Sequence, residues 1–471
     1  MQGHANGHRR RRRHAVARPW IWLAALAALM LLAAACEADP DDELVEDPEA
    51  EADESDEDDP EDDPDDDPDD EPDDEDDEDD EPDEEDEPDP DDDAITIGVV
   101  SALEGPFADG AEDGGRAIEM AIDDFDGEVA GRPIETSIES SDTSADTAVE
   151  RSRQLVEQEE VDLMFGPLSG TEGVAISEYA ETVPDMTFID AASGGIPSTL
   201  EGPDNYFRFT AEGSQQGGNI GTYAYEELGY ERMATLGEDY DFPHALVGSF
   251  IEDFCTAGGE VVEAFWVPLG ESDYSSVIAS IPEDVDAIYG GIGGSDAVNF
   301  LEQSIEFGID VPIVGGSILV DETVLAAEGA DLREAVTDIV ASAPVHPNPD
   351  DELWVEWSER YHDMFPDEGF DEPSLFAALY YNNFRSLLEA VESVDGDLDD
   401  RDALHEALRD LEWEGPIGPV GPLNENNQGS VRNFIFEIAE GEGEELDTEL
   451  RQVDDGIEPA EEVYERMDGC P

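Results

Sequence analysis

One short turn combines glycine, proline and hydroxyl residues in a pattern suited to holding an anion. The turn at 166–171 reads Gly-Pro-Leu-Ser-Gly-Thr and lies between an apolar run at 161–165 and a helical pattern. A helix that begins here offers free backbone N–H groups and a partial positive charge, and hydroxyl residues cap such starts. Such a helix start can hold an anion. A capped turn without a ligand is the alternative.

Catalytic and cofactor motifs are missing from the sequence. Ser169 and Ser193 lack the Gly-x-Ser-x-Gly context of a hydrolase nucleophile, and neither a Walker loop nor a dinucleotide fingerprint occurs. The three Cys residues form no CxxC pair, which argues against a zinc site. We therefore expect no catalysis, no cofactor and no metal.

Charge excludes one class of partner. The formal net charge is −109, and all 20 cations are Arg. Such a field repels nucleic acid.

Residues 94–471 alone hold 87 acidic residues against 14 Arg, and salt would screen their mutual repulsion. We hypothesise a halophilic acidic protein; an ordinary acidic exported protein is the alternative.

The first 36 residues have the features of an export signal. Arg9–Arg13 and Arg18 precede an apolar run at 20–32, which is too short for a comfortable membrane span. Three Ala residues and Cys36 follow. This resembles a lipoprotein signal, which implies lipidation of Cys36 and an extracytoplasmic protein anchored to the membrane. Plain secretion or a retained anchor are the alternatives.

Residues 37–93 are expected to form a disordered acidic tether. They hold 42 acidic residues, no basic ones and repeated prolines, with almost nothing apolar to bury. Weak calcium binding is the alternative role of this segment. We place the function of the protein after it.

The remaining chain alternates between strand and helix patterns. Strand patterns lie at 95–100, 134–138, 161–165 and 186–189, then again at 233–236, 261–267, 285–289 and 311–314. Helical patterns lie at 145–159 and 172–181, then at 243–257, 273–280 and 295–307. This alternation predicts an α/β fold of two doubly wound parallel-sheet lobes, with a ligand cleft between them. A later helix carries an apolar stripe at Phe376, Tyr380, Phe384, Leu387, Leu388 and Val391.

Four short motifs occur in order along this region. They are LEGPFA at 103–108, FGPLS at 165–169, NYFRF at 205–209 and GPVGPL at 418–423, the last followed by Gly429. With these motifs, the chain resembles the branched-chain amino-acid-binding (leucine-binding) group of type I periplasmic binding proteins. The resemblance implies a substrate-binding subunit of an ABC importer, with permease and ATPase subunits as partners and a monomeric state.

The resemblance also implies how the lobes are built. It places chain crossings, which together form a three-segment hinge, near 212–214, 341–344 and 423–428. Within a solute-binding domain at 94–471, lobe 1 would hold about 95–212 and 343–424. Lobe 2 would hold about 214–341 and 428–466.

Further ligand contacts are carried over from the family's loops. In the turn at 166–171, the resemblance implies that Ser169, Gly170 and Thr171 hold the ligand carboxylate. The other implied contacts are Ala192, Ser193 and Gly194 in the second turn, Tyr240 and Phe242 in lobe 2, and Gly291 and Ser317. The alternatives are a loop of small residues without a function for 192–194 and core packing for Phe242.

Two positions depart from the family. Ile292 stands where an aromatic residue is common, and Gly315-Gly316-Ser317 lacks the acid that often receives the ligand ammonium group. A branched-chain amino acid or a similar small solute is the expected ligand, and an amide or an aromatic carboxylate fits as well. A ligand-sensing receptor subunit and a surface protein with a degenerate cleft are the alternative functions.

Cys255 and Cys470 remain after Cys36 is assigned to the lipid anchor. An exported protein permits a disulfide bond between them, and two unpaired thiols are the alternative.

Overall fold

The computed structural model describes residues 94–309, 311–327, 330–348, 351–366, 369–441, 446–460 and 463–470. The predicted signal, Cys36 and the acidic tether lie outside the described residues. None of the helices in the described ranges combines the length and the apolar composition of a membrane span.

The first sheet has six strands in the order β2-β3-β1-β4-β5-β6. All its pairs are parallel except β2 with β3. The strands are β1 (Ile95–Ser101), β2 (Glu128–Val129), β3 (Arg132–Ser140), β4 (Leu163–Phe165), β5 (Phe188–Ile189) and β6 (Tyr206–Phe207). The helices between them are α1 (Ala108–Asp123), α2 (Ala145–Glu157), α3 (Gly170–Ala180) and α4 (Pro197–Leu200). We call this sheet and its helices lobe 1.

The second sheet has seven strands in the order β15-β14-β11-β10-β9-β7-β8. They are β7 (Arg232–Glu238), β8 (Glu260–Val267), β9 (Ala287–Gly291), β10 (Ile313–Gly315), β11 (Val340–Ala343), β14 (Val431–Glu440) and β15 (Leu446–Ile457). The helices are α5 (Gly213–Gln216), α6 (Ile220–Glu226), α7 (Asp241–Ala257), α8 (Ser275–Ile278), α9 (Gly294–Phe307), α10 (Glu322–Leu325) and α11 (Ala330–Val336). We call this group lobe 2, and the two parallel-dominated sheets confirm the predicted fold class.

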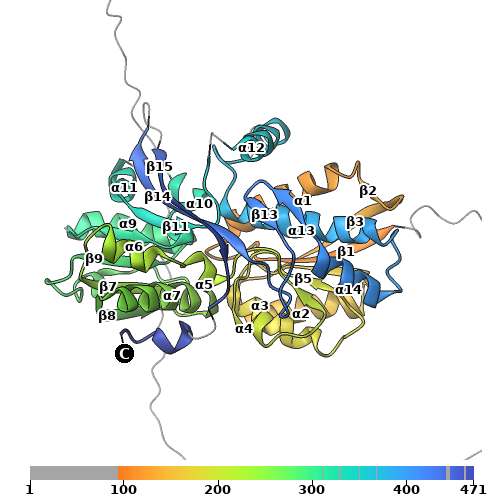
Figure 1. Ribbon diagram of the computed structural model, residues 1–471, viewed down its shortest axis with the longest axis horizontal. Coiled ribbons are helices and arrows are strands. Elements are labelled where there is room, and N and C mark those ends of the chain that lie inside the picture. The colour runs from red at the N-terminus through yellow and green to blue at the C-terminus, as the bar shows by residue number, and fades with distance from the viewer. Residues whose placement is uncertain are drawn as a thin grey trace, which may run out of the picture. The chain divides into compact units, whose positions relative to one another are not determined.

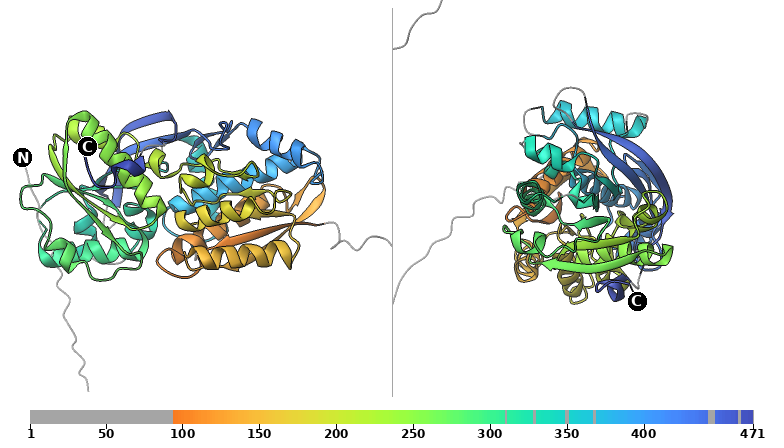
Figure 2. Two further views of the ribbon diagram at one scale, coloured as in Figure 1. Left: turned by 90° about the horizontal axis from the view of Figure 1, so that it is seen from below. Right: turned by 90° about the vertical axis from the view of Figure 1, so that its left-hand side faces the viewer.

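The C-terminal part of the chain contributes to both lobes, as the blue segments of Figures 1 and 2 show. Helix α13 (Leu375–Ser393) packs on α1 of lobe 1, and α14 (Arg401–Asp410) packs on α13. Strands β14 and β15 instead continue the sheet of lobe 2 as an antiparallel pair. The remaining elements are α12 (Glu352–Met364) and a two-stranded sheet of β12 (Trp413–Gly415) and β13 (Gly418–Val420).

The apolar stripe of α13 is buried, as its spacing predicts. The Phe384 ring lies edge-on to Phe165 of β4, with the ring centroids 5.0 Å apart. Two glycines of α1 let α13 approach closely. A Cβ at Gly114 would lie 2.7 Å from Tyr380, which is too close for any side chain. This packing holds α13 on lobe 1.

Three segments that run between the lobes are hydrogen-bonded to one another. The Gln215 side chain donates to the carbonyl of Gly429 over 2.9 Å, and the Ser342 hydroxyl donates to the carbonyl of Gln216 over 2.8 Å. Asn433 donates to the Gln216 carbonyl over 3.1 Å. These bonds join the segments near 215, 342 and 429.

The structure contains a disulfide bond between Cys255 of α7 and Cys470. It fixes the last described residues to lobe 2. Val463 is buried there and lies against Gly248 of the same helix.

Candidate functional site between the two sheets

A small apolar cavity lies where the carboxyl ends of parallel strands from both lobes meet. It is lined by Phe107, Leu168, Ala192, Gln216, Tyr240, Phe242, Ile318, Leu375, Phe376 and Leu379. The Phe107 ring lies edge-on to Tyr240 and Phe376, at centroid distances of 6.5 and 5.8 Å. The free volume is about 10 Å³, room for about one water molecule. The lobes are thus closed, and a ligand enters only when they separate.

The turn at 166–171 lies on the lobe 1 side of this cavity. Ser169 directly precedes α3, is buried and forms a capping box with Glu172, and it is not among the residues that line the cavity. Its backbone N–H donates to Glu172 Oε2 over 3.3 Å. The Thr171 hydroxyl instead donates to Asp241 of lobe 2 over 2.8 Å. The turn therefore places a buried hydroxyl at a helix start, next to the lining residue Leu168, and also takes part in lobe closure.

Phe242 of lobe 2 is packed against two glycines of lobe 1. A Cβ at Gly170 would lie 2.6 Å from the Phe242 nitrogen, and a Cβ at Gly194 would lie 2.6 Å from its ring. Gly194 also has a φ of +63°, which favours glycine. Both glycines therefore let the lobes meet closely at the edge of the cavity.

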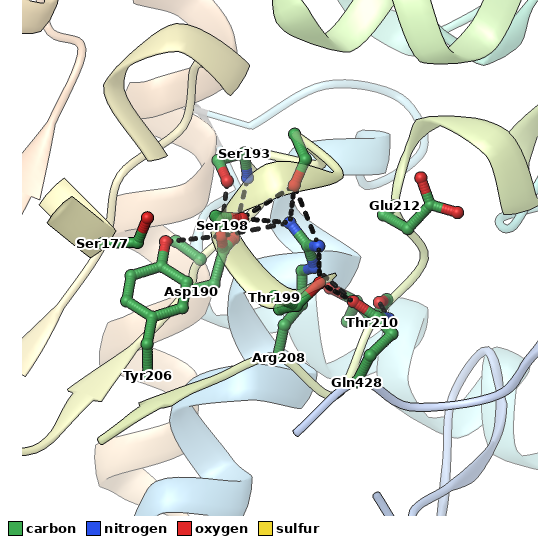
Figure 3. Close-up of polar contacts among 12 residues, drawn as sticks. Ser177, Asp190, Ser193, Ser198, Thr199, Tyr206, Arg208, Thr210, Glu212 and Gln428 are labelled. Atoms are coloured by element: carbon green, nitrogen blue, oxygen red, sulfur yellow. Dashed lines mark hydrogen bonds and ion pairs between the residues drawn. The ribbon is translucent and has the colours of Figure 1, made fainter. Parts of the chain in front are cut away.

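The second turn, 190–195, is held by a buried polar network (Figure 3). The Ser193 backbone N–H and hydroxyl both donate to Asp190, the first over 2.8 Å. The Tyr206 hydroxyl donates to the same carboxylate over 2.7 Å. Ala192 lines the cavity. The Ser193 hydroxyl donates its hydrogen bond to Asp190 and so stabilises the turn.

Arg208 is the centre of this network and is fully buried. Its guanidinium group lies 3.4 Å from Asp190 Oδ2 and donates to the Gly195 carbonyl over 3.1 Å. It also donates to Thr199 over 2.8 Å and to Gln428 over 2.6 Å. Arg208 thus ties the second turn to the late crossing segment.

The lobe 2 candidates differ in their placement. Tyr240 and Phe242 line the cavity, on either side of the start of α7. The Ser317 hydroxyl donates to Gln216 over 2.6 Å, one residue before the lining residue Ile318. Gly291 is buried in β9, where a Cβ would lie 2.6 Å from Val247, and it does not line the cavity.

Several lining residues were missed by sequence reasoning. Leu375, Phe376 and Leu379 belong to the apolar face of α13, which reads as core. Phe107 lies in the LEGPFA motif, and Gln216 lies in the first crossing segment. The motif is the signal that could have identified Phe107, and the neighbouring crossing is the signal that could have identified Gln216.

Acidic side chains surround the cavity on both sides. Burial raises the pKa of Glu172 to about 7. Burial raises the pKa of Tyr240 well above its usual value, and the charges of Glu238, Asp296 and Glu172 raise it further. A second cavity of about 840 Å³ shares Leu375 with the first and is lined by six acidic residues, Asp321, Glu322, Glu359, Asp371, Glu372 and Asp447. The electrostatic surroundings of the site are therefore negative.

Comparisons with known proteins agree with this architecture. The sequence profile for "Periplasmic binding protein" matches residues 94–443. The Leu/Ile/Val-binding protein homolog 6 of Brucella melitensis is 23% identical over 380 residues, covering 78% of this chain and 94% of that protein.

Solved structures share the fold. An ABC transporter substrate-binding protein from Sphaerobacter thermophilus has a TM-score of 0.70 and 25% identity, over 78% of this chain and 99% of that one. A solute-binding protein from R. palustris in complex with benzoate has a TM-score of 0.71 and 20% identity, over 78% and 98% of the two chains. A branched-chain amino acid transporter substrate-binding protein from Streptococcus pneumoniae, in complex with isoleucine, has a TM-score of 0.64 and 20% identity, over 76% and 100%. With its profile match over residues 94–443, the chain belongs to the periplasmic binding protein family.

Proposed function

We propose that this protein is the extracytoplasmic substrate-binding subunit of an ABC importer, which closes its two lobes over a small amphiphilic carboxylate. The observation that carries the proposal is the cavity itself. Aromatic rings from both lobes line it, and its lining residue Leu168 directly precedes the buried Ser169 at the start of α3. The family consists of solute-binding proteins and not of enzymes, in agreement with the absence of a catalytic motif from the sequence.

The chemistry of the cavity favours this ligand class. The Ser169 hydroxyl and the N–H groups at the start of α3 would hold the carboxylate. Phe107, Tyr240, Phe242 and Phe376 would cover its apolar body. Benzoate and isoleucine, each bound by a protein of the same fold, both combine a carboxylate with an apolar group.

We assign the remaining candidates supporting or contacting roles. Ala192 contacts the ligand, Gly170 and Gly194 let Phe242 of lobe 2 approach lobe 1, and Thr171 joins the lobes. Ser193 and Gly291 shape the walls, and Ser317 positions Gln216.

Closure is a two-state process in this proposal. A solute that touches both lobes binds only the closed state tightly, so it shifts the population toward that state. The closed form is the one that a permease and its ATPase subunits would recognise. A single chain holds both halves of the cavity, so we propose that the monomer is sufficient.

The N-terminal sequence supports export and anchoring. We propose that residues 1–36 direct export, that Cys36 carries the lipid, and that residues 37–93 act as a tether above the membrane. Acyl chains would hold such a protein firmly on the membrane surface. Partition of the Cys36→Ser variant into the soluble fraction, with wild type in the membrane fraction, tests the anchor. Equal partition of both proteins would contradict it.

The acidity of residues 94–471 supports a salt-loving protein, since salt screens the mutual repulsion of the acids. We expect the unfolding temperature to rise as NaCl is added. An unfolding temperature that does not depend on NaCl would exclude this property and would leave the solute-binding proposal in place.

Thermal unfolding against a panel of amino acids, amides and aromatic acids tests the solute-binding proposal. A ligand at about 100 times its Kd adds roughly 2.7 kcal/mol of stability, which raises Tm by a few degrees. Ser169→Ala should reduce the shift for the cognate ligand, and Ser177→Ala on the same helix should not. Equal shifts for Ser169→Ala and wild type would show that the site is misplaced.

A further inference from the structure

The C-terminal end of the chain lies along helix α7 of lobe 2, as the darkest blue part of the ribbon in Figure 1 shows. Residues 463–470, which we call the C-terminal segment, begin with the one-turn helix η3 (Val463–Arg466). They end at Cys470, which forms the disulfide bond with Cys255. The segment is therefore attached covalently to α7 near the C-terminal end of that helix.

Further contacts fix the C-terminal segment on lobe 2. Val463 is buried, and a Cβ at Gly248 of α7 would collide with the Val463 carbonyl oxygen. Glycine at position 248 thus lets the segment approach α7 closely. Trp266 of β8 donates its indole N–H to the carbonyl of Met467 over 3.3 Å. The segment therefore has a defined place on lobe 2 along its length.

The first residues of the C-terminal segment also contact lobe 1. Val463 forms a buried apolar cluster with Ala245 of α7 and with Ile196, which directly precedes α4 in lobe 1. Leu200 of α4 and Tyr464 pack against this cluster. None of these five residues lines the small cavity. The cluster is therefore a contact between the lobes that lies apart from the residues around the cavity.

Tyr464 links the C-terminal segment to a second contact between the lobes. Its hydroxyl donates to the carbonyl of Asp241, the first residue of α7, over 3.3 Å. The carboxylate of Asp241 accepts the hydroxyl of Thr171 in lobe 1 over 2.8 Å. The segment thus supports the turn of α7 that is hydrogen-bonded to lobe 1.

We propose that the C-terminal segment, attached to α7 by the disulfide bond, holds the two lobes together in the closed state through its contact with Ile196 and Leu200. Separation of the lobes would expose the apolar cluster to water, which is unfavourable. The covalent attachment restricts the free chain end, so less conformational entropy is lost when the segment packs against lobe 1.

This role is separate from recognition of the solute. A contact that exists only in the closed state raises the closed population before any solute binds. The affinity for a solute that binds the closed state rises with that population. The disulfide bond would therefore influence affinity without touching the solute.

An interlobe distance measured without solute tests the proposal on the full chain. Fluorescent non-natural amino acids on α14 of lobe 1 and α9 of lobe 2 report the distance and leave the cysteines unlabelled. We expect a longer mean distance for Cys470→Ser, and for wild type treated with dithiothreitol, than for untreated wild type. Equal distances in the three samples would overturn the proposal, and the disulfide bond would then stabilise lobe 2 alone.

A matched pair of substitutions separates contact between the lobes from general stability. Ile196→Val removes one methylene group from the cluster that joins the lobes, and Ile176→Val removes one from a buried cluster within lobe 1. The two side chains are 2% and 1% exposed. Only Ile196→Val should shift the ratio of open to closed protein, by about two- to tenfold toward the open state. A shift in both variants, or in neither, would contradict the proposal.

The double variant Cys470→Ser/Ile196→Val tests whether the attachment acts through this contact. If it does, the two changes alter the interlobe distance by less than the sum of their separate effects. Fully additive effects would overturn the link between the disulfide bond and lobe 1.

Titration of the same proteins with L-leucine and benzoate separates this proposal from the proposed function. For a compound that wild type binds, we expect a two- to tenfold weaker affinity in Ile196→Val, in proportion to the loss of closed protein. Expected shifts in distance without binding of either compound would support the role of the C-terminal segment and count against the proposed function. Binding with unchanged distances would do the reverse.

Discussion

The hydroxyl of Thr171 donates a hydrogen bond to Asp241 Oδ2 over 2.8 Å, and so joins the start of α3 in lobe 1 to the start of α7 in lobe 2. The Asp241 N–H returns a longer bond of 3.5 Å to the same hydroxyl. Both helices begin at the cavity. Lobe closure and the shape of the cavity are therefore coupled through this pair.

Removal of this pair should favour the open state. In Thr171→Val the closed state loses a bond that contributes about 0.5–1.5 kcal/mol, so an interlobe fluorescence distance measured without solute should lengthen. Thr182→Val is the control, because that hydroxyl bonds to the Tyr179 carbonyl within lobe 1. An unchanged distance in Thr171→Val, or an equal change in Thr182→Val, would contradict this role.

Arg208 should be a major determinant of stability. Arg208→Met leaves Asp190 buried without its cation, and the loss of one partner from a buried pair costs about 3–5 kcal/mol. Urea unfolding should show this loss. Arg432→Met, which removes a partly exposed pair with Asp455, should cost no more than about 1 kcal/mol. Similar losses for the two variants would show that the network in Figure 3 contributes little.

Glu172 should make stability fall as pH rises. Burial raises the pKa of this carboxyl from 4.5 to about 7, so between these values the folded protein holds a proton that the unfolded chain has released. The stabilisation is complete below about pH 4.5 and is lost as pH rises to about 7, by about 3 kcal/mol in all.

The Glu172→Gln variant isolates this effect. Its free energy of unfolding should exceed that of wild type by an amount that grows between pH 5 and pH 8, as measured by urea unfolding. Glu178→Gln, at an exposed position of the same helix, should follow wild type. A constant difference between Glu172→Gln and wild type would rule out titration of Glu172 in this window.

The Cys255–Cys470 bond should stabilise lobe 2. Cys470→Ser should lower the free energy of unfolding by about 2–4 kcal/mol, and reduction of wild type should lower it equally. Thiol counting after denaturation of the exported protein should find neither cysteine free. Two reactive thiols would exclude the bond.

The periodic spacing of apolar residues predicted the helices and strands that bury one face or both faces. The stripe of α13 and the strand–helix alternation of lobe 1 are examples, since each places apolar residues on a fixed side. Strand β15 (Leu446–Ile457) was not predicted, because charged residues fill it and most of it is exposed. Its partner β14 supplies the hydrogen bonds, which no local pattern reveals.

The candidate site was only partly accessible from sequence. Tyr240 and Phe242 could be named from their loop, and both line the cavity. Phe376 and Leu379 could not be distinguished from core residues. A helix has the same spacing of apolar residues whether they are buried within one lobe or against the other lobe.

Calorimetric titration of the purified protein with L-leucine, L-isoleucine and benzoate tests the central proposal most directly. Our account predicts saturable binding of at least one of them, with one molecule per chain and a weaker affinity in Ser169→Ala and Tyr240→Ala. Absence of heat with every compound, for protein that unfolds cooperatively on heating, would contradict closure of these lobes over a small amphiphilic carboxylate.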